Sequence, residues 1–265
     1  MRRLLATTFS VITALVAALV ATPAWAGRNC EARPPTPASV AQAMSLAERT
    51  AAALDRSGAR VVVLGRVGQD LSRYGVHWSH LALAYRAAPG EPWRLVHKLN
   101  QCGTAQSSIY RQGLGDFFLD DLWRYEAGFV VLAPELQDRL LAALADNARL
   151  TAVDTPAYSM VAYAWATRYQ QSNQWAIETL AAFADADVRD RARAQAWLQA
   201  RDYRPAVLRL NTFERLGARV TAGNVAFDDH PNEKRFAGRI ETVTVDSVFE
   251  WLARSGLGSR VEVVR

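Results

Sequence analysis

The spacing of hydrophobic and polar residues predicts one helix and then several strands in the first half of the chain. Over residues 36–58, apolar side chains recur every three or four positions, with Pro in the first turn and Gly at the end. The β-branched run at residues 60–65 predicts a buried strand. Residues 79–86 and 93–99 predict a hairpin, because the segment between them is rich in Pro and Gly.

In the second strand of this hairpin, alternation assigns the side chains to two faces. Trp93, Leu95, His97 and Leu99 should point one way, and Arg94, Val96 and Lys98 the other way. A loop-rich segment should follow over residues 100–125, where glycines are frequent.

The second half of the chain predicts further helices and short strands. Helices are expected at 134–147, from Ser172 or Asn173 to about Ala184, and in an Arg-rich segment at 188–200. Short strands are expected at 128–133, 225–227, 239–245 and 261–264, with Asp246 capping a last helix. Helices and strands do not alternate regularly. We therefore expect a single-domain α+β fold, an antiparallel sheet with packed helices, rather than a doubly wound one.

The N-terminal residues have the three zones of a secretory signal peptide. Arg2 and Arg3 precede an apolar run over residues 4–20, and small residues at Ala24 and Ala26 match a cleavage site. A membrane anchor is the alternative, but the run is short for a span and a proline follows it. We expect cleavage after Ala26 and a periplasmic product.

The remaining chain is expected to form one domain. Residues 1–26 are assigned to the signal peptide and residues 27–265 to the α+β domain, of which residues 27–36 form a polar N-terminal arm. No later segment is apolar for long enough to cross a membrane. The formal charge is +5, or +3 without the signal peptide, and the basic residues form no cluster with interleaved aromatic residues. Nucleic-acid binding is therefore not expected.

The chain contains two cysteines, Cys30 and Cys102. An exported chain matures where paired thiols become disulfides, so a Cys30–Cys102 bridge is the favoured interpretation. The alternative is that Cys102 is a free, nucleophilic thiol.

The strongest candidate for acid–base chemistry is the segment at residues 77–80, which contains His77 and His80. His80 stands at the start of a predicted buried strand beside a Gly-containing loop. A histidine held there could act as a general base, because its pKa lies near working pH. The simpler alternative is a hydrogen-bonded histidine of the core or its rim.

A second candidate is the predicted helix start at residues 172–178. The N-terminus of a helix attracts anions and nucleophiles, which makes Asn173, Gln174 and Glu178 ligand-binding candidates. The alternative is plain capping by Ser172 or Asn173, with Glu178 exposed.

A third, weaker candidate is a metal site at Asp228, Asp229 and His230. A turn held by salt bridges is the default interpretation, because no further ligands lie at zinc spacing. The familiar motifs of nucleotide, zinc and serine-hydrolase sites are absent, so no cofactor is expected.

Four stretches resemble an uncharacterised family of exported bacterial proteins, the domain-of-unknown-function family 2145. They are His77-Trp78-Ser79-His80, Leu99-Asn100-Gln101-Cys102-Gly103, Tyr169-Gln170-Gln171-Ser172-Asn173-Gln174-Trp175 and Asp228-Asp229-His230-Pro231. Together they span most of the mature chain, but the family brings no established activity.

The segment from Ser79 to Ala84 also resembles the His-bearing strand of circularly permuted papain-like (NlpC/P60-type) proteins. In those proteins a nucleophilic Cys begins a later helix, and Ser172-Asn173-Gln174 resembles that helix start. Here Asn173 or Gln174 stands where the Cys would be, and an amide cannot form a thiolate. The resemblance thus implies a scaffold that has lost catalysis.

Three hypotheses follow. The first is a non-catalytic envelope protein that binds a peptide, glycan or lipid fragment in a groove between His80 and the helix at Asn173. The second is a thiol hydrolase, a peptidase or amidase that uses Cys102 with His80 or His97 as its base. The third is a metal enzyme at residues 228–230. We favour the first.

Overall fold

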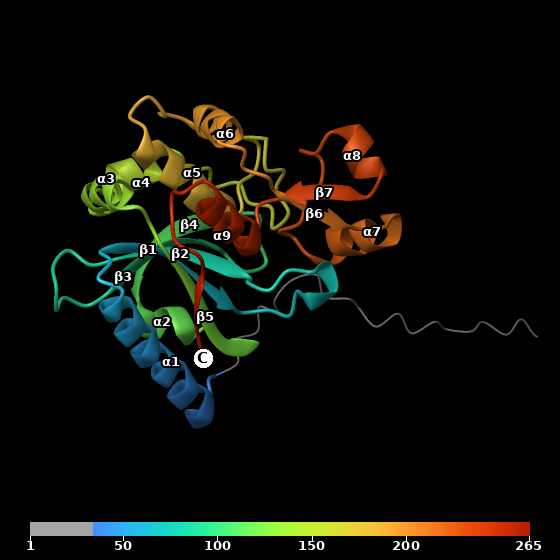
Figure 1. The fold of residues 1–265 in the computed structure, drawn as a ribbon. Coiled ribbons are helices and arrows are strands. Elements are labelled where there is room, and N and C mark those ends of the chain that lie inside the picture. Colours follow the sequence, from blue (N-terminus) through green and yellow to red (C-terminus); the bar gives the residue numbers. More distant parts are fainter. Residues whose placement is uncertain (1–33) are drawn as a thin grey trace, which may run out of the picture.

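The computed structural model describes residues 34–265. The predicted signal peptide and Cys30 lie outside the described residues. A six-stranded sheet forms the centre of the molecule, with the order β4-β3-β2-β1-β5-β8 and every neighbouring pair antiparallel (Figure 1). The strands are β1 Val61–Val67, β2 His80–Tyr85, β3 Arg94–Asn100, β4 Ser107–Gly113, β5 Arg124–Val131 and β8 Glu262–Val264.

One face of the sheet is covered by α1 (Pro37–Arg56) and α2 (Leu114–Phe118). Thr36 caps α1, since its Oγ1 accepts a hydrogen bond from the backbone N of Ser39 at 3.1 Å. The inner side of α1 packs with Phe117, Phe118 and the even-numbered residues of β2 in one apolar cluster. This face of the sheet therefore receives Ala82 and Ala84.

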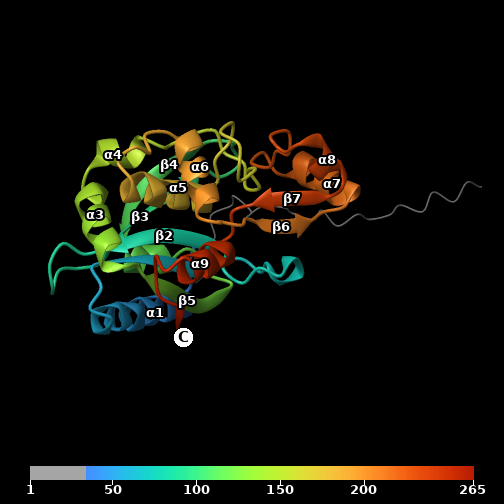
Figure 2. The same ribbon diagram turned by 45° about the horizontal axis from the view of Figure 1, so that its top comes forward.

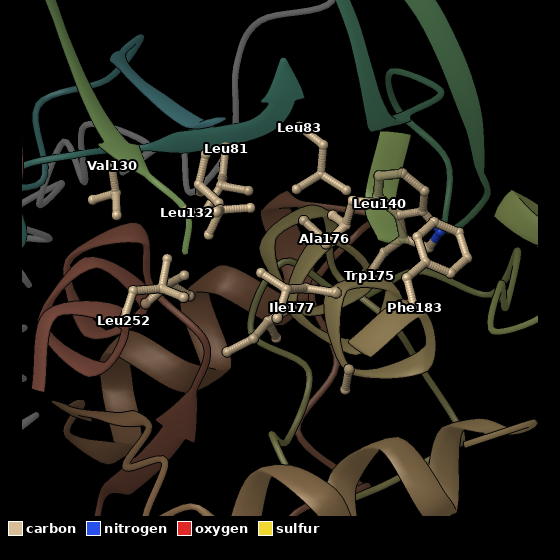
Figure 3. Packing of buried hydrophobic residues seen from close by; sticks show 14 of the residues in the cluster. Leu81, Leu83, Val130, Leu132, Leu140, Trp175, Ala176, Ile177, Phe183 and Leu252 are labelled. Carbon is tan, nitrogen blue, oxygen red and sulfur yellow. The ribbon is translucent and has the colours of Figure 1, made fainter. Parts of the chain in front are cut away.

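The opposite face carries the larger core, built around α5 (Ser172–Ala184) with α3 (Pro134–Leu144) and α9 (Val245–Arg254). Figure 3 shows Leu81 and Leu83 of β2 pointing toward Trp175, Ala176 and Ile177 of α5. Strand β1 is buried at every position, because helices cover both faces of the sheet. The odd-numbered residues of β2 thus face α5.

Short elements complete the body and form a lobe at one end (Figure 2). A two-stranded sheet of β6 (Ala206–Arg209) and β7 (Arg239–Thr242) carries α7 (Thr212–Thr221) and α8 (Asn232–Phe236), around a third apolar cluster. The other elements are η1 Ser72–Tyr74, α4 Asn147–Thr151 and α6 Arg191–Ala200. Between residues 34 and 265, no helix is both long and apolar enough to span a membrane.

The predicted single-domain α+β arrangement with an antiparallel sheet is confirmed. The alternation in β3 is also confirmed: Leu95 lies in the cluster with α1 and Val96 in the cluster with α5.

Four predictions of local structure outside α5 were wrong. Residues 100–125 are not all loop, because β4 and α2 form there; β4 is a partly exposed edge strand without the apolar run that marks a buried one. Residues 225–227 form no strand, although Val225 and Phe227 are buried. Asn147 begins α4 instead of ending the preceding helix.

The fourth concerns the last helix, which follows a strand that ends at Thr242. Its cap is Thr244, whose Oγ1 accepts from the backbone N of Ser247 at 3.1 Å. Asp246 instead lies in the first turn, where its carboxylate accepts from the backbone N of His77 and of Trp78.

Candidate functional site

The start of α5 is held in place by Gln171, which is the N-cap of the helix. Its Oε1 accepts from the backbone N of Asn173 at 3.1 Å, and its Nε2 donates to Thr242 Oγ1 at 3.1 Å and to the carbonyl of Val243. The cap is thus Gln171, where Ser172 or Asn173 was expected. Because Gln171 binds both the helix and the end of β7, the helix start has one fixed position.

Two amide side chains follow the cap, and both are buried. Asn173 is 7% exposed and Gln174 is 1% exposed. The Nε2 of Gln174 donates to the carbonyls of Tyr163 and Ala164 at 3.2 and 3.3 Å. Asn173 Oδ1 and Gln174 Oε1 have no hydrogen-bond partner among the described residues. Two buried acceptors are therefore left at this helix start.

Asp229 and His230 also contact Tyr163. The Nδ1 of His230 is 2.9 Å from Asp229 Oδ1, and Asp229 Oδ2 accepts from the backbone N of Tyr163 at 2.7 Å. The rings of Tyr163 and His230 lie 4.9 Å apart, centroid to centroid. We call Tyr163, Asn173, Gln174, Asp229 and His230 the Tyr163 cluster.

His230 adds a third unpartnered atom to the cluster, its Nε2, which is buried. Since the Asp229 carboxylate accepts from Nδ1–H, the other nitrogen of a neutral ring is an acceptor. All three unpartnered atoms then accept hydrogen bonds. A group that donates hydrogen bonds, such as a hydroxyl, amide or ammonium, is the complement of this arrangement.

The carboxylates at residues 228 and 229 point to different partners. Asp228 pairs with Arg168 at 2.9 Å, whereas Asp229 faces His230. Within residues 34–265 no group of three or more His, Cys, Asp or Glu side chains could hold a metal ion. The segment is held as a turn by the Arg168–Asp228 salt bridge and the Asp229–His230 hydrogen bond.

Glu178 lies in the second turn of α5 and is fully buried. The alternative interpretation of this segment had expected Glu178 to be exposed. Arg191 Nε donates to its Oε2 at 2.7 Å, Gln170 Nε2 to Oε2 at 2.6 Å and Gln195 Nε2 to Oε1 at 2.8 Å. Burial raises the pKa of Glu178, and Arg191 opposes that shift. With both oxygens occupied, Glu178 joins α5 to α6 and is not available to a ligand.

Lys98 continues this buried polar network on β3. Its Nζ donates to Asp154 Oδ1 at 2.5 Å, to the carbonyl of Thr155 at 2.7 Å and to Gln170 Oε1 at 2.9 Å. All three donors of the ammonium are used. Burial lowers the pKa of Lys98, and the Asp154 carboxylate opposes that shift.

His80 lies on the opposite face of the sheet from α5. Its Nε2 is 2.8 Å from His97 Nδ1, and its ring lies 5.9 Å from that of Phe117, on the side covered by α1 and α2. Because side chains alternate along β2, His80 shares the face of Ala82 and Ala84. The expected groove between His80 and the helix at Asn173 and Gln174 is therefore not formed.

The two hydrogen-bonded histidines are held as neutral rings. His97 Nε2 is 2.8 Å from Gln112 Oε1, an acceptor, so Nε2 carries the proton and Nδ1 accepts from His80. Burial lowers the pKa of His97 to about 4, and Arg66 acts in the same direction. Burial also lowers the pKa of His80 well below its usual value, again assisted by Arg66. A base with so low a pKa is poorly matched to proton transfer at neutral pH.

His77 is separate from both histidines. Its Nε2 is 2.8 Å from Glu126 Oε1, and Glu126 Oε2 accepts from Arg265 Nε at 3.0 Å. Burial, the largest influence, raises the pKa of Glu126, but the bonds from His77 and Arg265 together outweigh it and lower the pKa. His77 therefore helps to fasten the C-terminus to β5.

Cys102 lies on the exposed turn between β3 and β4. No described cysteine is free. Both ring nitrogens of His97 are occupied, by His80 and Gln112, so His97 has none left for the sulfur.

Three surface cavities lie away from the candidate residues. A cavity of about 550 Å³ is lined by α6 and residues 187–189, one of about 400 Å³ by α1 and the β2–β3 turn, and one of about 360 Å³ by α1 and β8. The Tyr163 cluster lines none of them. Its unpartnered atoms are buried.

Residues 53–252 match the model of a family described as an uncharacterized protein conserved in bacteria, DUF2145. The chain belongs to DUF2145. The four stretches on which the DUF2145 resemblance rests, from residue 77 to residue 231, all lie inside the matched range. No curated protein and no solved structure matches the chain.

Two residues that organise the site of this DUF2145 chain escaped the sequence analysis. Tyr163 acts largely through its backbone N and carbonyl, which leave no signal in a sequence. Arg191 was seen only as part of a polar helix. Its signal was the i,i+4 spacing with Gln195, which puts two donors on one helix face.

Proposed function

We propose that this DUF2145 chain is an exported, non-catalytic binding protein of the bacterial envelope. We further propose that its Tyr163 cluster receives a hydrogen-bond donor of a peptide or glycan fragment. The observation that carries the proposal is the set of three buried acceptors, Asn173 Oδ1, Gln174 Oε1 and His230 Nε2, that lack partners.

An energetic argument supports binding at this place. A buried polar atom without a hydrogen bond costs about 1–3 kcal/mol. A ligand that brings N–H or O–H groups would recover this cost at each acceptor it reaches. Peptides and glycans offer such donors, whereas the tails of a lipid fragment offer none.

The absence of a usable nucleophile supports a non-catalytic role. His230 and Asp229 have the pairing of an acid–base dyad, but no Ser, Thr or Cys of the described chain is hydrogen-bonded to His230 Nε2. The hydroxyl of Ser172, at the helix start, is bonded to Tyr158. The thiol-hydrolase alternative with Cys102 gains no support from the positions of His80 and His97.

Export is proposed from the N-terminal sequence, together with a Cys30–Cys102 bridge. Cys102 lies on an exposed turn, and residues 34–265 contain no free cysteine. Mass spectrometry of the native protein tests both points. We expect a chain that begins at Gly27 and weighs two hydrogens less than its reduced form. An unprocessed chain in the cytoplasm would refute export.

Binding is tested by calorimetry with two probes, N-acetylmuramyl dipeptide and the tripeptide Ala-Ala-Ala. We expect millimolar or tighter binding of at least one probe, and a Kd about five- to tenfold weaker in Gln174→Ala, because one buried hydrogen bond is lost. Gln199→Ala is the matched control, since Gln199 is exposed on α6.

Two outcomes would contradict the proposal. If neither probe binds, or if Gln174→Ala and Gln199→Ala bind alike, the cluster is not the site. If either probe is cleaved and His230→Gln abolishes cleavage, the protein is an enzyme.

A further inference from the structure

Helix α7 presents its bulky apolar residues to solvent. Phe213 is 85% exposed, Leu216 is 61% exposed and Val220 is 78% exposed. Their spacing of three and four places them on one side of the helix. No residue of α7 is buried, and its contact with the third apolar cluster is made by the small side chain of Ala218. A surface helix of a globular protein turns its apolar side toward the core, whereas α7 turns its apolar side toward solvent.

The orientation of α7 is fixed by polar contacts on its other sides. Asn211 and Glu214 form a capping box at its start, with bonds of 2.9 and 2.8 Å. Glu214 also pairs with Arg73 of η1, and Arg215 Nη1 donates to the carbonyl of Leu210 at 2.7 Å. Rotation of the helix to bury Phe213 would break the Glu214–Arg73 ion pair, the one contact of this set that reaches another element.

The exposed side of α7 is open and adjoins a further exposed aromatic residue. A side chain at Gly217, which lies within the stripe, would meet nothing within 4 Å. Phe236 at the end of α8 is 69% exposed, and Gly238, two residues later, packs on Leu210 at the base of α7. Both helices lie at the same end of the molecule in Figure 2. Exposed apolar area of this kind marks an interaction surface.

The charge beside this surface is positive. Arg219 lies next to the apolar stripe on the same helix, and Arg209 and Arg239 are exposed on the neighbouring strands. Arg239 pairs with Glu241 at 3.8 Å, whereas neither Arg209 nor Arg219 forms an ion pair with another described residue. The one acidic residue of α7, Glu214, is already paired with Arg73. An anionic partner therefore complements this face.

We propose that the exposed face of α7, formed by Phe213, Leu216, Val220 and Arg219, docks on an anionic phospholipid surface. An amphipathic helix with aromatic and aliphatic residues on one side and arginines beside them lies in the headgroup region of such a bilayer. The arginines meet lipid phosphates while the apolar side chains enter the acyl boundary. The N-terminal arm is not a suitable cover, because residues 27–35 are polar. A second copy of the chain would bring the same arginines together and repel.

Vesicle flotation of the mature chain tests the proposal. Vesicles of phosphatidylethanolamine and phosphatidylglycerol, 3:1, are compared with vesicles of phosphatidylcholine alone. We expect binding to the anionic vesicles, weakened at high salt, and little binding to phosphatidylcholine. Phe213→Ser should weaken binding about tenfold or more, because a bulky apolar side chain is lost from the interface. Arg219→Glu should also weaken it.

Val220→Ser and Val263→Ser form a matched pair, since both remove an exposed valine and Val263 lies on β8 of the main sheet. Only Val220→Ser should weaken binding, and circular dichroism should show both variants folded. Equal binding by the two variants, or equal binding to both kinds of vesicle, would overturn the proposal. The proposal would also be overturned if the chain formed a concentration-dependent dimer, if Phe213→Ser abolished that dimer, and if the chain bound no vesicles. The face would then join two copies of the chain.

Discussion

Acidification should destabilise the protein through the hydrogen-bonded pair of His80 and His97. The perturbation is a fall in pH from 7 to 5, which protonates histidines of the unfolded chain with an ordinary pKa of 6.5. In the folded chain, burial holds the pKa of His97 at about 4. Protonation there would also set Nδ1–H of His97 against the N–H of His80, across a contact that is now a 2.8 Å hydrogen bond.

The sign and size follow from proton linkage. Because the pKa of His97 is lower in the folded chain, the unfolded chain binds the proton first. The stability is therefore complete near pH 7, and it falls as the pH drops from about 6.5 toward 4. From His97 alone, a shift from 6.5 to about 4 lowers the free energy of unfolding by roughly 2 kcal/mol at pH 5 and roughly 3 kcal/mol at pH 4. His80 adds a loss of the same sign.

Urea unfolding followed by tryptophan fluorescence measures this loss, since the chain contains 8 tryptophans. The double variant His80→Gln/His97→Gln should lose at least about 2 kcal/mol less than the wild type between pH 7 and pH 5, because it removes the contributions of both histidines. Equal losses in the two proteins would refute the reasoning. If the double variant fails to fold, NMR titration of His97 in the wild type decides the question, and an ordinary pKa there would refute it.

Two further predictions concern the core. Glu178→Leu should lower the free energy of unfolding by about 3–5 kcal/mol, because it leaves the buried Arg191 without its carboxylate partner. In urea unfolding, the double variant Glu178→Leu/Arg191→Met should lose less stability than the sum of the losses in the two single variants. Additive losses would contradict the pairing. Gly128→Ala should lower the melting temperature, because the new Cβ would lie 2.6 Å from the Trp78 ring. Gly217→Ala, on the open side of α7, should instead raise the free energy of unfolding by about 0.5–1 kcal/mol. A higher melting temperature in Gly128→Ala would contradict the packing.

The strands of the main sheet could be predicted because their signals are local. Val61 to Leu64 form an uninterrupted apolar run. The period of two along β3 assigned its side chains to both faces from residue order. Strand β4 lacks such a signal. Its residues Ser107–Gly113 are partly exposed, and pairing with β3 through seven registered residues holds it in place.

The candidate site was harder to predict, because its contacts join distant residues or use the backbone. The residue order could identify His80 as a strand residue, but it could not say which face of the sheet α5 would cover. One position along β2 decides whether His80 or Leu81 meets α5. Similarly, the aspartate at 246 was assigned to a helix cap, although its carboxylate binds backbone 169 residues away in sequence, at His77.

Hydrogen-bond satisfaction separates residues that hold the fold from residues that are left for a ligand. Gln170 is an example of the first kind: its Oε1 accepts from Lys98 and its Nε2 donates to Glu178 and to the carbonyl of Val153. Gln174, four residues later, uses only its Nε2 and leaves Oε1 buried without a partner. The two glutamines belong to the same stretch of sequence and have the same side chain. Their different bonding therefore points to Gln174, and not to Gln170 or the internally paired Glu178, as the residue whose loss should alter binding more than folding.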